Sequence, residues 1–319
     1  MRAEGECMIV YSFIIPHKNC PVLLNRCLDS IPTRDDIQII VVDDNSDVDK
    51  KPTLSRQDVE LVLLDEEHSK GAGRARNVGM EKAQGKWLLF PDADDYYTDY
   101  LPKLLDKYAD DNQTDIVYLN AHRIDDQGKK KPLIINRLIN NYLKGIKGAE
   151  ADLRYSVWTA WTRMVKRELV FNHHLSFEEL PAGNDRMFGL KASMYSKTIG
   201  VEKEFVYKYY KWPNGSVTDK IRQNLVDELL TGYGRVMVFY KTVGYQNKFA
   251  LLNIIENLVR EKKITVKQAF VKYKRYLKEY NLFWGKDITC YLYNLIFVRV
   301  RKRAMLLFRE WFVDKHNGL

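Results

Sequence analysis

The chain has 319 residues, of which 45% are apolar, so it can bury a sizeable core in one large or two small domains. Its four cysteines, Cys7, Cys20, Cys27 and Cys290, form no CxxC pair and no zinc-spaced cluster, which excludes a disulfide framework and a structural zinc site. The net charge of +9 is concentrated in residues 241–319, which hold 17 Lys and Arg against 6 Asp and Glu. No apolar run reaches the roughly 18 residues of a spanning helix and no signal peptide precedes the first strand, so we expect a cytoplasmic protein.

Short β-branched runs alternate with helical patterns through the first 110 residues. Strands are predicted over 10–16, 37–44, 59–65 and 86–92. Helices are predicted from the apolar spacing of 23–28 and over 71–85, where Gly85 is a candidate C-cap. This alternation predicts parallel βαβ units with helices on both faces of the sheet. Ligands bind such sheets outside the carboxyl ends of the strands, and the acids Asp43, Asp44, Asp92 and Asp94 fall there.

The pattern loosens beyond residue 110. Strands are predicted over 115–124 and 204–212, with a helix over 184–196. After Asp219 the pattern is helical, with one apolar stripe formed by Val266, Phe270, Tyr273, Leu277 and Tyr280.

The segment LLFPDADDYYTDY (88–100) places Asp92, Asp94 and Asp95 within four positions. Carboxylates this close repel one another unless a positive charge lies among them. One interpretation is a helix start near Tyr100, capped by Asp95 or Thr98. The other is a Mg²⁺ or Mn²⁺ site, because these cations prefer hard oxygen ligands together with substrate phosphates.

Other acid-rich or nucleotide-binding α/β classes fit less well. A receiver domain carries its acid pair after the first strand, whereas here the pair follows the second. A haloacid-dehalogenase-type phosphatase needs Thr or Val after D-x-D, whereas Asp95 and Tyr96 follow here. The chain contains neither a Walker A sequence nor GxGxxG.

Four ordered motifs, SFIIPHKN, IIVVDDNS, GAGRARNVG and LLFPDADD, resemble those of the family 2 glycosyltransferases. The resemblance covers residues 9–100 firmly and 101–218 loosely. It implies a GT-A fold, a Rossmann-like and mainly parallel sheet flanked by helices. Residues 8–110 would then bind the nucleotide-sugar, 111–218 the acceptor, and 219–319 would form a basic helical extension.

The resemblance also implies a donor site. Its nucleotide-sugar-binding residues would be Pro16, Asn19, Asp43, Asp44, Arg76 and Asp92. In this assignment Asp44 bonds the base, while Asp43 either assists it or only caps the strand end. Asn77 would fix the loop, and Asp94 would coordinate the divalent cation, Mn²⁺ or Mg²⁺, on the diphosphate.

The catalytic base implied by the resemblance is Asp185, in the stretch FEELPAGNDRMF. The family has a Glu before this Asp, whereas this chain has Asn184. Glu178 or Glu179 remains an alternative base, and Asn184 could instead cap the following helix.

Two further positions depart from the family pattern. His17 stands where an aromatic ring stacks on the base, so His17 could stack there or Lys18 could contact phosphate; the alternative is a structural role for both residues. Trp212 lies close to where an Arg is expected and could form a wall for a sugar or belong to the core.

The basic segment 291–312, YLYNLIFVRVRKRAMLLFREWF, has the composition of a membrane-surface helix. It would allow peripheral contact with the inner face of the plasma membrane, or it could pack as a helical cap. We expect no nucleic-acid partner, because no recognised module accompanies the charge.

The sequence therefore predicts an inverting glycosyltransferase. Its donor would be a nucleotide-diphosphate sugar, with a UDP-sugar favoured, and its acceptor a glycan or lipid-linked oligosaccharide in surface polysaccharide synthesis. The alternatives are a sugar nucleotidyltransferase and a catalytically inactive glycosyltransferase-like scaffold.

Overall fold

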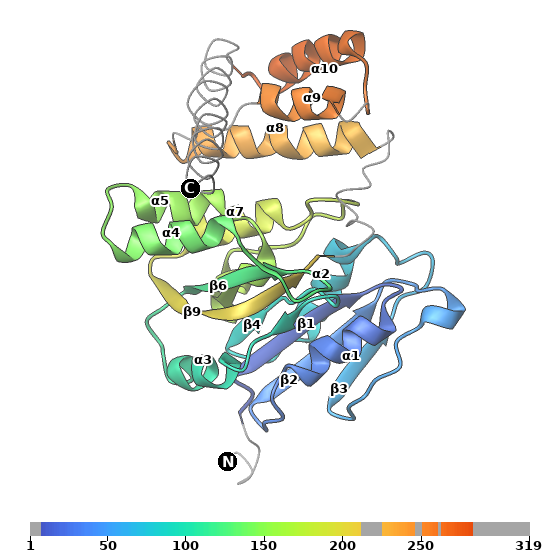
Figure 1. The fold of residues 1–319 in the computed structure, drawn as a ribbon, viewed down its shortest axis with the longest axis vertical. Coiled ribbons are helices and arrows are strands. Elements are labelled where there is room, and N and C mark those ends of the chain that lie inside the picture. Colours follow the sequence, from blue (N-terminus) through green and yellow to red (C-terminus); the bar gives the residue numbers. More distant parts are fainter. Residues whose placement is uncertain (1–7, 212–224, 246–250, 261–262, 283–319) are drawn as a thin grey trace, which may run out of the picture. The chain divides into compact units, whose positions relative to one another are not determined.

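The computed structural model describes residues 8–211, 225–245, 251–260 and 263–282 (Figure 1). The chain divides into two compact units, Met1–Lys220 and Ile221–Leu319. This division lies next to the predicted start of the extension at residue 219, whereas a boundary at residue 110 stays a prediction. Within the described ranges, no helix is long and apolar enough to cross a membrane.

The first unit is built on one mixed sheet. Its described strands are β1 (Tyr11–His17), β2 (Ile37–Asp43), β3 (Val59–Leu63), β4 (Trp87–Leu89), β5 (Tyr96–Tyr97), β6 (Ile116–Ile124), β7 (Lys130–Pro132), β8 (Arg163–Lys166) and β9 (Ile199–Tyr210). They lie in the order β3-β2-β1-β4-β8-β6-β9-β5, with β7 paired to β6. The first four strands of this order are mutually parallel, β8 runs antiparallel to both of its neighbours, and β6 and β9 are parallel.

Helices flank this sheet. They are α1 (Pro21–Asp29), α2 (Ala72–Lys82), α3 (Leu101–Tyr108), α4 (Ile134–Leu143), α5 (Ala149–Ser156), α6 (Arg167–Asn172) and α7 (Arg186–Tyr195), with short 3₁₀ turns η1 (Val48–Lys50) and η2 (Ala160–Thr162). Helix α2 packs on β1 and β2, whereas α4 packs on β6 and β9 (Figure 1). The predicted α/β fold, with a mainly parallel sheet in its first half, is confirmed.

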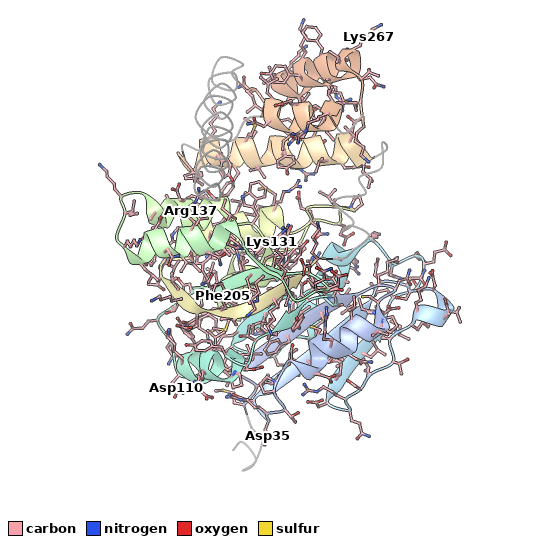
Figure 2. The ribbon with its side chains drawn as sticks, viewed as in Figure 1. Asp35, Asp110, Lys131, Arg137, Phe205 and Lys267 are labelled. Atoms are coloured by element: carbon pink, nitrogen blue, oxygen red, sulfur yellow. The ribbon has the colours of Figure 1, made fainter. Side chains whose placement is uncertain are left out.

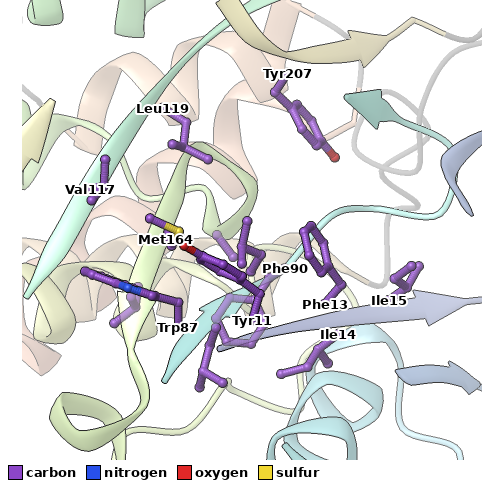
Figure 3. Packing of buried hydrophobic residues seen from close by; sticks show 14 of the residues in the cluster. Tyr11, Phe13, Ile14, Ile15, Trp87, Phe90, Val117, Leu119, Met164 and Tyr207 are labelled. Atoms are coloured by element: carbon purple, nitrogen blue, oxygen red, sulfur yellow. The ribbon is translucent and has the colours of Figure 1, made fainter. Parts of the chain in front are cut away.

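The core lies where β1 and β4 meet the second half of the sheet. Every residue of β1 is buried, which explains its continuous apolar sequence, because a parallel strand covered on both faces has no solvated side. Figure 3 shows Phe13 of β1, Trp87 of β4, Met164 of β8 and Tyr207 of β9 in the same buried cluster. The two halves of the sheet therefore share one core.

The predicted ends of β4 and α2 are among those that were wrong. Strand β4 stops at Leu89 rather than at 92, and Pro91, which has no N–H to donate to a ladder, follows almost at once. Helix α2 stops at Lys82, so Gly85 is not its C-cap. A Cβ on Gly85 would lie 2.5 Å from the main-chain nitrogen of Ser12, so this glycine permits a close approach to β1.

The second unit contains α8 (Val226–Thr242), α9 (Leu251–Arg260) and α10 (Val266–Glu279). Their described contacts form a separate apolar cluster, whose buried residues are Val226, Leu229, Leu230, Ile255, Leu258, Ile264, Ala269 and Tyr276. The stripe predicted for α10 was wrong in part, because Val266 and Phe270 are exposed and Ala269 and Tyr276 take the buried face.

Candidate active site

His17, at the carboxyl end of β1, is buried rather than available for stacking. Its Nδ1 lies 2.7 Å from Asp43 Oδ1, and its Nε2 accepts a hydrogen bond from the Cys20 N–H at 3.2 Å. Because Nε2 is an acceptor, Nδ1 must carry the proton and donate it to Asp43. Stacking of His17 on a base was therefore a wrong prediction.

Both carboxylate oxygens of Asp43 have internal partners. Ser46 Oγ donates to Oδ1 at 2.5 Å and the Ser46 N–H donates to Oδ2 at 3.0 Å. Burial acts to raise the pKa of Asp43, but the bonds from Ser46 and His17 outweigh it and hold that pKa below its usual value. The geometry favours the structural alternative for Asp43.

Asn19 and Asp44 join the loops beyond β1 and β2. Asn19 has a φ of +57° and its Oδ1 accepts a hydrogen bond from the Asp47 N–H at 2.8 Å. Asp44 Oδ1 accepts bonds from Ser69 Oγ at 3.0 Å and the Gly71 N–H at 3.1 Å. These bonds therefore hold together the loops that follow β1 and β2 and the residues that precede α2.

Pro16 and Lys18 flank His17. Pro16 lies in β1 past the part that pairs with β4, so its missing N–H removes no bond from that ladder. The Lys18 ammonium donates to the Asp44 main-chain oxygen at 2.7 Å, so it neighbours the acid proposed to hold the base.

The three aspartates after β4 form a tight turn. The Asp95 N–H donates to the Asp92 carbonyl at 3.0 Å, and one carboxylate oxygen from each of Asp92, Asp94 and Asp95 lies within 4.8 Å of the others. Asp95 is fully buried, and its Oδ1 accepts the Tyr210 N–H at 2.7 Å. Helix α3 starts at Leu101 with no side-chain cap, so the capping interpretation of Asp95 was wrong.

Arg76 connects this turn to the segment before α7. Its guanidinium donates through Nη2 to Asp92 and through Nη1 to Asn184 Oδ1 at 2.8 Å. Its carbon Cζ lies 5.3 Å from the centre of the Phe177 ring. Asn77 fixes the same segment, because its side chain exchanges two hydrogen bonds with the Phe177 main chain. Asn184 is thus a partner of Arg76 and not a helix cap.

Asp185 lies directly before α7, in the same electrostatic environment. Burial raises the pKa of Asp185; Arg76 opposes this rise, and the Asp92 charge adds to it. A raised pKa suits a group that must accept a proton near neutral pH. Of the alternative bases, Glu179 is at the surface near Lys70 and Arg74, at 3.6 and 3.7 Å.

The main chain of the remaining alternative, Glu178, packs closely against helix α2. Its N–H donates to the Asn184 carbonyl at 3.0 Å, and its own carbonyl lies where a Cβ on Gly73 would be only 2.0 Å away. The close approach of Gly73 therefore helps to set the position of the segment that carries the candidate bases Glu178, Glu179 and Asp185.

Several residues of this region were not predicted. The Tyr207 hydroxyl accepts the Asp92 N–H at 3.0 Å, and Trp161 stacks on Tyr207 and Tyr209 with ring centres 5.0 and 5.4 Å apart. Arg26 of α1 donates to the Asp94 carbonyl at 2.7 Å. No sequence signal marks these residues, because their partners lie far away along the chain. Trp212 lies outside the described residues.

The acidic turn fits a hard divalent cation. Burial, followed by the charges of Asp94 and Asp92, raises the pKa of Asp95 well above its usual value, as expected of a buried carboxyl group beside two other carboxylates. Three carboxylates within reach of one point are the donor set that Mg²⁺ or Mn²⁺ prefers.

The sheet order, the acidic turn and the carboxylate before α7 together define an α/β domain of the GT-A class. The model of glycosyl transferase family 2 matches residues 12–170. Uncharacterized glycosyltransferase EpsJ of Bacillus subtilis (strain 168) is 26% identical over 243 residues, covering 73% of this chain and 70% of its own length. The chain belongs to glycosyl transferase family 2.

Solved structures share this fold. TarS of Staphylococcus aureus, a poly(ribitol-phosphate) β-N-acetylglucosaminyltransferase, is 23% identical over 63% of this chain, which spans only 35% of the length of TarS. A crystal structure of TarS residues 1–349 with UDP-GlcNAc superposes with a TM-score of 0.57 over 72% of this chain and 66% of that one, at 19% identity. The mannosyltransferase PcManGT of Pyrobaculum calidifontis, in complex with GDP-Man and Mn²⁺, gives a TM-score of 0.53 at 16% identity, over 89% of this chain and 86% of that one.

Proposed function

We propose that this chain transfers a sugar from a nucleoside-diphosphate sugar to a hydroxyl of a glycan or lipid-linked acceptor, with inversion, in surface polysaccharide synthesis. The observation that carries this proposal is the Arg76 guanidinium, which bonds Asp92 of the acidic turn and Asn184 beside Asp185. This bridge joins a site for a diphosphate to a candidate base. The nucleotide-sugars bound to TarS and PcManGT support the donor class, and the former favours a UDP-sugar.

Asp185 would act as the base. Its carboxylate takes the proton of the acceptor hydroxyl, the hydroxyl oxygen bonds to the anomeric carbon, and the bond to the nucleoside diphosphate breaks on the opposite face. Arg76 holds Asp92 and Asn184 in place on either side of this reaction. The carboxylates of Asp92, Asp94 and Asp95 would hold Mn²⁺ or Mg²⁺, which when bound stabilises the charge of the departing diphosphate as a Lewis acid.

Ligand-induced thermal shifts test the donor site. We expect one of UDP, GDP, dTDP and CMP to raise the melting temperature only with Mn²⁺, because ligand binding stabilises the native state by mass action. Asp94→Asn should lose this shift, whereas the matched control Asp99→Asn, an exposed acid just past the turn, should retain it. A chain that responds to none of the four would contradict the proposal and leave the inactive scaffold.

Asp185→Asn separates binding from catalysis in the same experiment. It should retain the nucleotide shift but lose transfer by about 10²–10⁴-fold, which is what general base catalysis contributes. Normal transfer by Asp185→Asn together with loss in Glu178→Gln would move the base to Glu178. Release of pyrophosphate instead of a nucleoside diphosphate would indicate a nucleotidyltransferase.

Peripheral contact with an anionic membrane is part of the same proposal. The predicted basic segment 291–312 lies outside the described residues. Helix α10 gives independent support, because Val266 and Phe270 are 73% and 60% exposed while Lys267 and Lys274 lie on the same face. Figure 2 labels Lys267, whose side chain extends away from the helix. Exposed apolar side chains among lysines suit the boundary between headgroups and acyl chains.

A further inference from the structure

The two ends of the Asp92–Asp95 turn are anchored to the same strand, β9. The Asp92 N–H donates to the Tyr207 hydroxyl at 3.0 Å, and the Tyr210 N–H donates to Asp95 Oδ1 at 2.7 Å. The Asp95 N–H closes the turn on the Asp92 carbonyl. These bonds fix the outer residues of the turn, and Ala93 and Asp94 form its corner.

Arg26 holds that corner from another element, helix α1. Its Nη2 donates to the main-chain carbonyl of Asp94 at 2.7 Å. The guanidinium lies over two rings, with Cζ 4.4 Å from the centre of Tyr96 and 4.3 Å from the centre of Tyr210. Two cation–π contacts and a hydrogen bond to a carbonyl therefore hold one side chain, and arginine is the residue best suited to this combination.

We propose that Arg26 is the positioning residue of the divalent-cation site. It fixes the corner of the turn so that the Asp94 carboxylate meets those of Asp92 and Asp95 at one point. This inference rests on the proposed function, since it assigns the cation site to those three carboxylates. Arg26 acts through the Asp94 main chain, as a group in an outer shell orients the residues that ligate a metal.

The charge of Arg26 alone predicts the opposite effect. A guanidinium near a cation site repels the cation, so its removal should strengthen metal binding if charge were its only influence. Orientation of Asp94 by Arg26 instead makes metal binding weaker when Arg26 is replaced. The two effects have opposite signs, so the direction of the change decides between them.

The test is titration of the full chain with Mn²⁺, followed by the electron paramagnetic resonance signal of free Mn²⁺, with and without UDP. We expect Arg26→Met and Arg26→Lys each to weaken Mn²⁺ binding by roughly 10-fold or more, the usual effect of losing an outer-shell partner. Arg26→Lys keeps the charge but loses the planar guanidinium group and its arrangement of N–H donors. The matched control is Lys208→Met, because Lys208 also lies over the Tyr96 ring, at 4.9 Å, and its loss removes the same charge. This control should bind Mn²⁺ at least as tightly as the wild type does.

Tyr210 provides a second test that does not replace Arg26. Tyr210→Phe keeps the ring and should bind Mn²⁺ normally, whereas Tyr210→Leu removes one of the two rings that contact Arg26 and should bind Mn²⁺ less tightly. Both keep the main-chain bond to Asp95, and the melting temperature of each variant checks folding.

The outcomes distinguish the positioning role of Arg26 from the existence of the cation site. A wild type that binds Mn²⁺, with Arg26→Met and Arg26→Lys binding equally or more tightly, would overturn the role of Arg26 and leave the cation site intact. A wild type that binds no Mn²⁺ even with UDP would overturn the cation site, and the role of Arg26 with it.

Discussion

At the scale of single residues, the acids at the strand ends divide into two kinds. Asp43 has its oxygens satisfied by Ser46 and His17, and it joins the loops after β1 and β2. Asp92, Asp94 and Asp95 instead bring their carboxylates around a common point, where burial and the neighbouring charges raise the pKa of Asp95. The first kind stabilises the fold, and the second is the group that we propose to hold a cation.

Asp43 makes a stability contribution that depends on pH. Its pKa is below the ordinary 3.8, so its stabilisation is present above that pH and is lost as the pH falls through the folded-state pKa. Asp43→Asn should lower the free energy of unfolding at pH 7 by about 1–3 kcal/mol, because an amide leaves one buried donor without an acceptor. Urea unfolding at pH 7 and below pH 3.8 measures the difference, which should shrink in acid. Asp49→Asn, an exposed neighbour, serves as the control, and an equal loss at both pH values would contradict this account.

The sequence was sufficient to find the acids but not what orients them. Asp92, Asp94 and Arg76 stand in motifs, so their proximity was foreseeable from the ends of parallel strands. Arg26 belongs to an amphipathic helix, where an arginine ordinarily faces solvent. Its role depends on two tyrosines of β5 and β9, and only the folded sheet brings these three residues together.

At the scale of elements, helix α2 carries Arg76 into the site and is held very close to the segment before α7. Gly73 makes this approach possible, because a Cβ there would lie 2.0 Å from the Glu178 carbonyl. Gly79, two turns on, faces β1, where a Cβ would lie 2.4 Å from Cγ2 of Ile14. The two glycines therefore allow one helix to approach two different neighbours closely.

Substitution of the two glycines distinguishes site geometry from stability. Gly73→Ala and Gly79→Ala should each destabilise the protein by about 1–3 kcal/mol through overpacking. Gly73→Ala should also weaken nucleotide binding, because the displaced segment carries Asn184, the partner of Arg76. Melting temperatures with and without UDP and Mn²⁺ measure both effects. Equal nucleotide binding by the two variants would show that this approach does not position the site.

The strands were predictable where apolar residues dominate, as in β1, β2 and the first half of β6. The ends of the strands were harder to predict. Pro91 and the Asp92–Asp95 turn end β4 at Leu89, although the apolar run continues beyond it. Strand β9 begins earlier than predicted, at Ile199, because pairing with β6 extends it through residues whose own pattern is weak. Tertiary pairing, rather than local preference, sets these limits.

At the scale of the whole molecule, the chain joins a catalytic unit to a basic helical unit with a core of its own. The residues of that second core come from α8, α9 and α10, together with Ile264 just before α10. Helix α10 leaves Phe270 and its lysine neighbours outside this core, with Lys274 Nζ 4.5 Å from the ring centre. This is the surface that we propose for contact with an anionic bilayer.

Vesicle binding tests that contact. The full chain should sediment with phosphatidylglycerol-containing vesicles and not with pure phosphatidylcholine vesicles. Phe270→Ser and Lys267→Glu should weaken binding, the latter by about 5-fold or more, since each charge near the surface contributes about 1 kcal/mol. Lys103→Glu, an exposed lysine of α3, makes the same charge change elsewhere and should have no effect. Equal binding by all variants would exclude this face of α10.

The attachment of the acidic turn to β9 also has a consequence for synthesis of the chain on the ribosome. All three aspartates have been translated by residue 95, but the tyrosines that anchor their turn belong to a strand that ends at Tyr210. Since translation proceeds from the N-terminus, a nascent chain with β1–β4 already folded still lacks the anchors of the turn that we propose to bind a cation. The turn gains these anchors only after β9 has been synthesised.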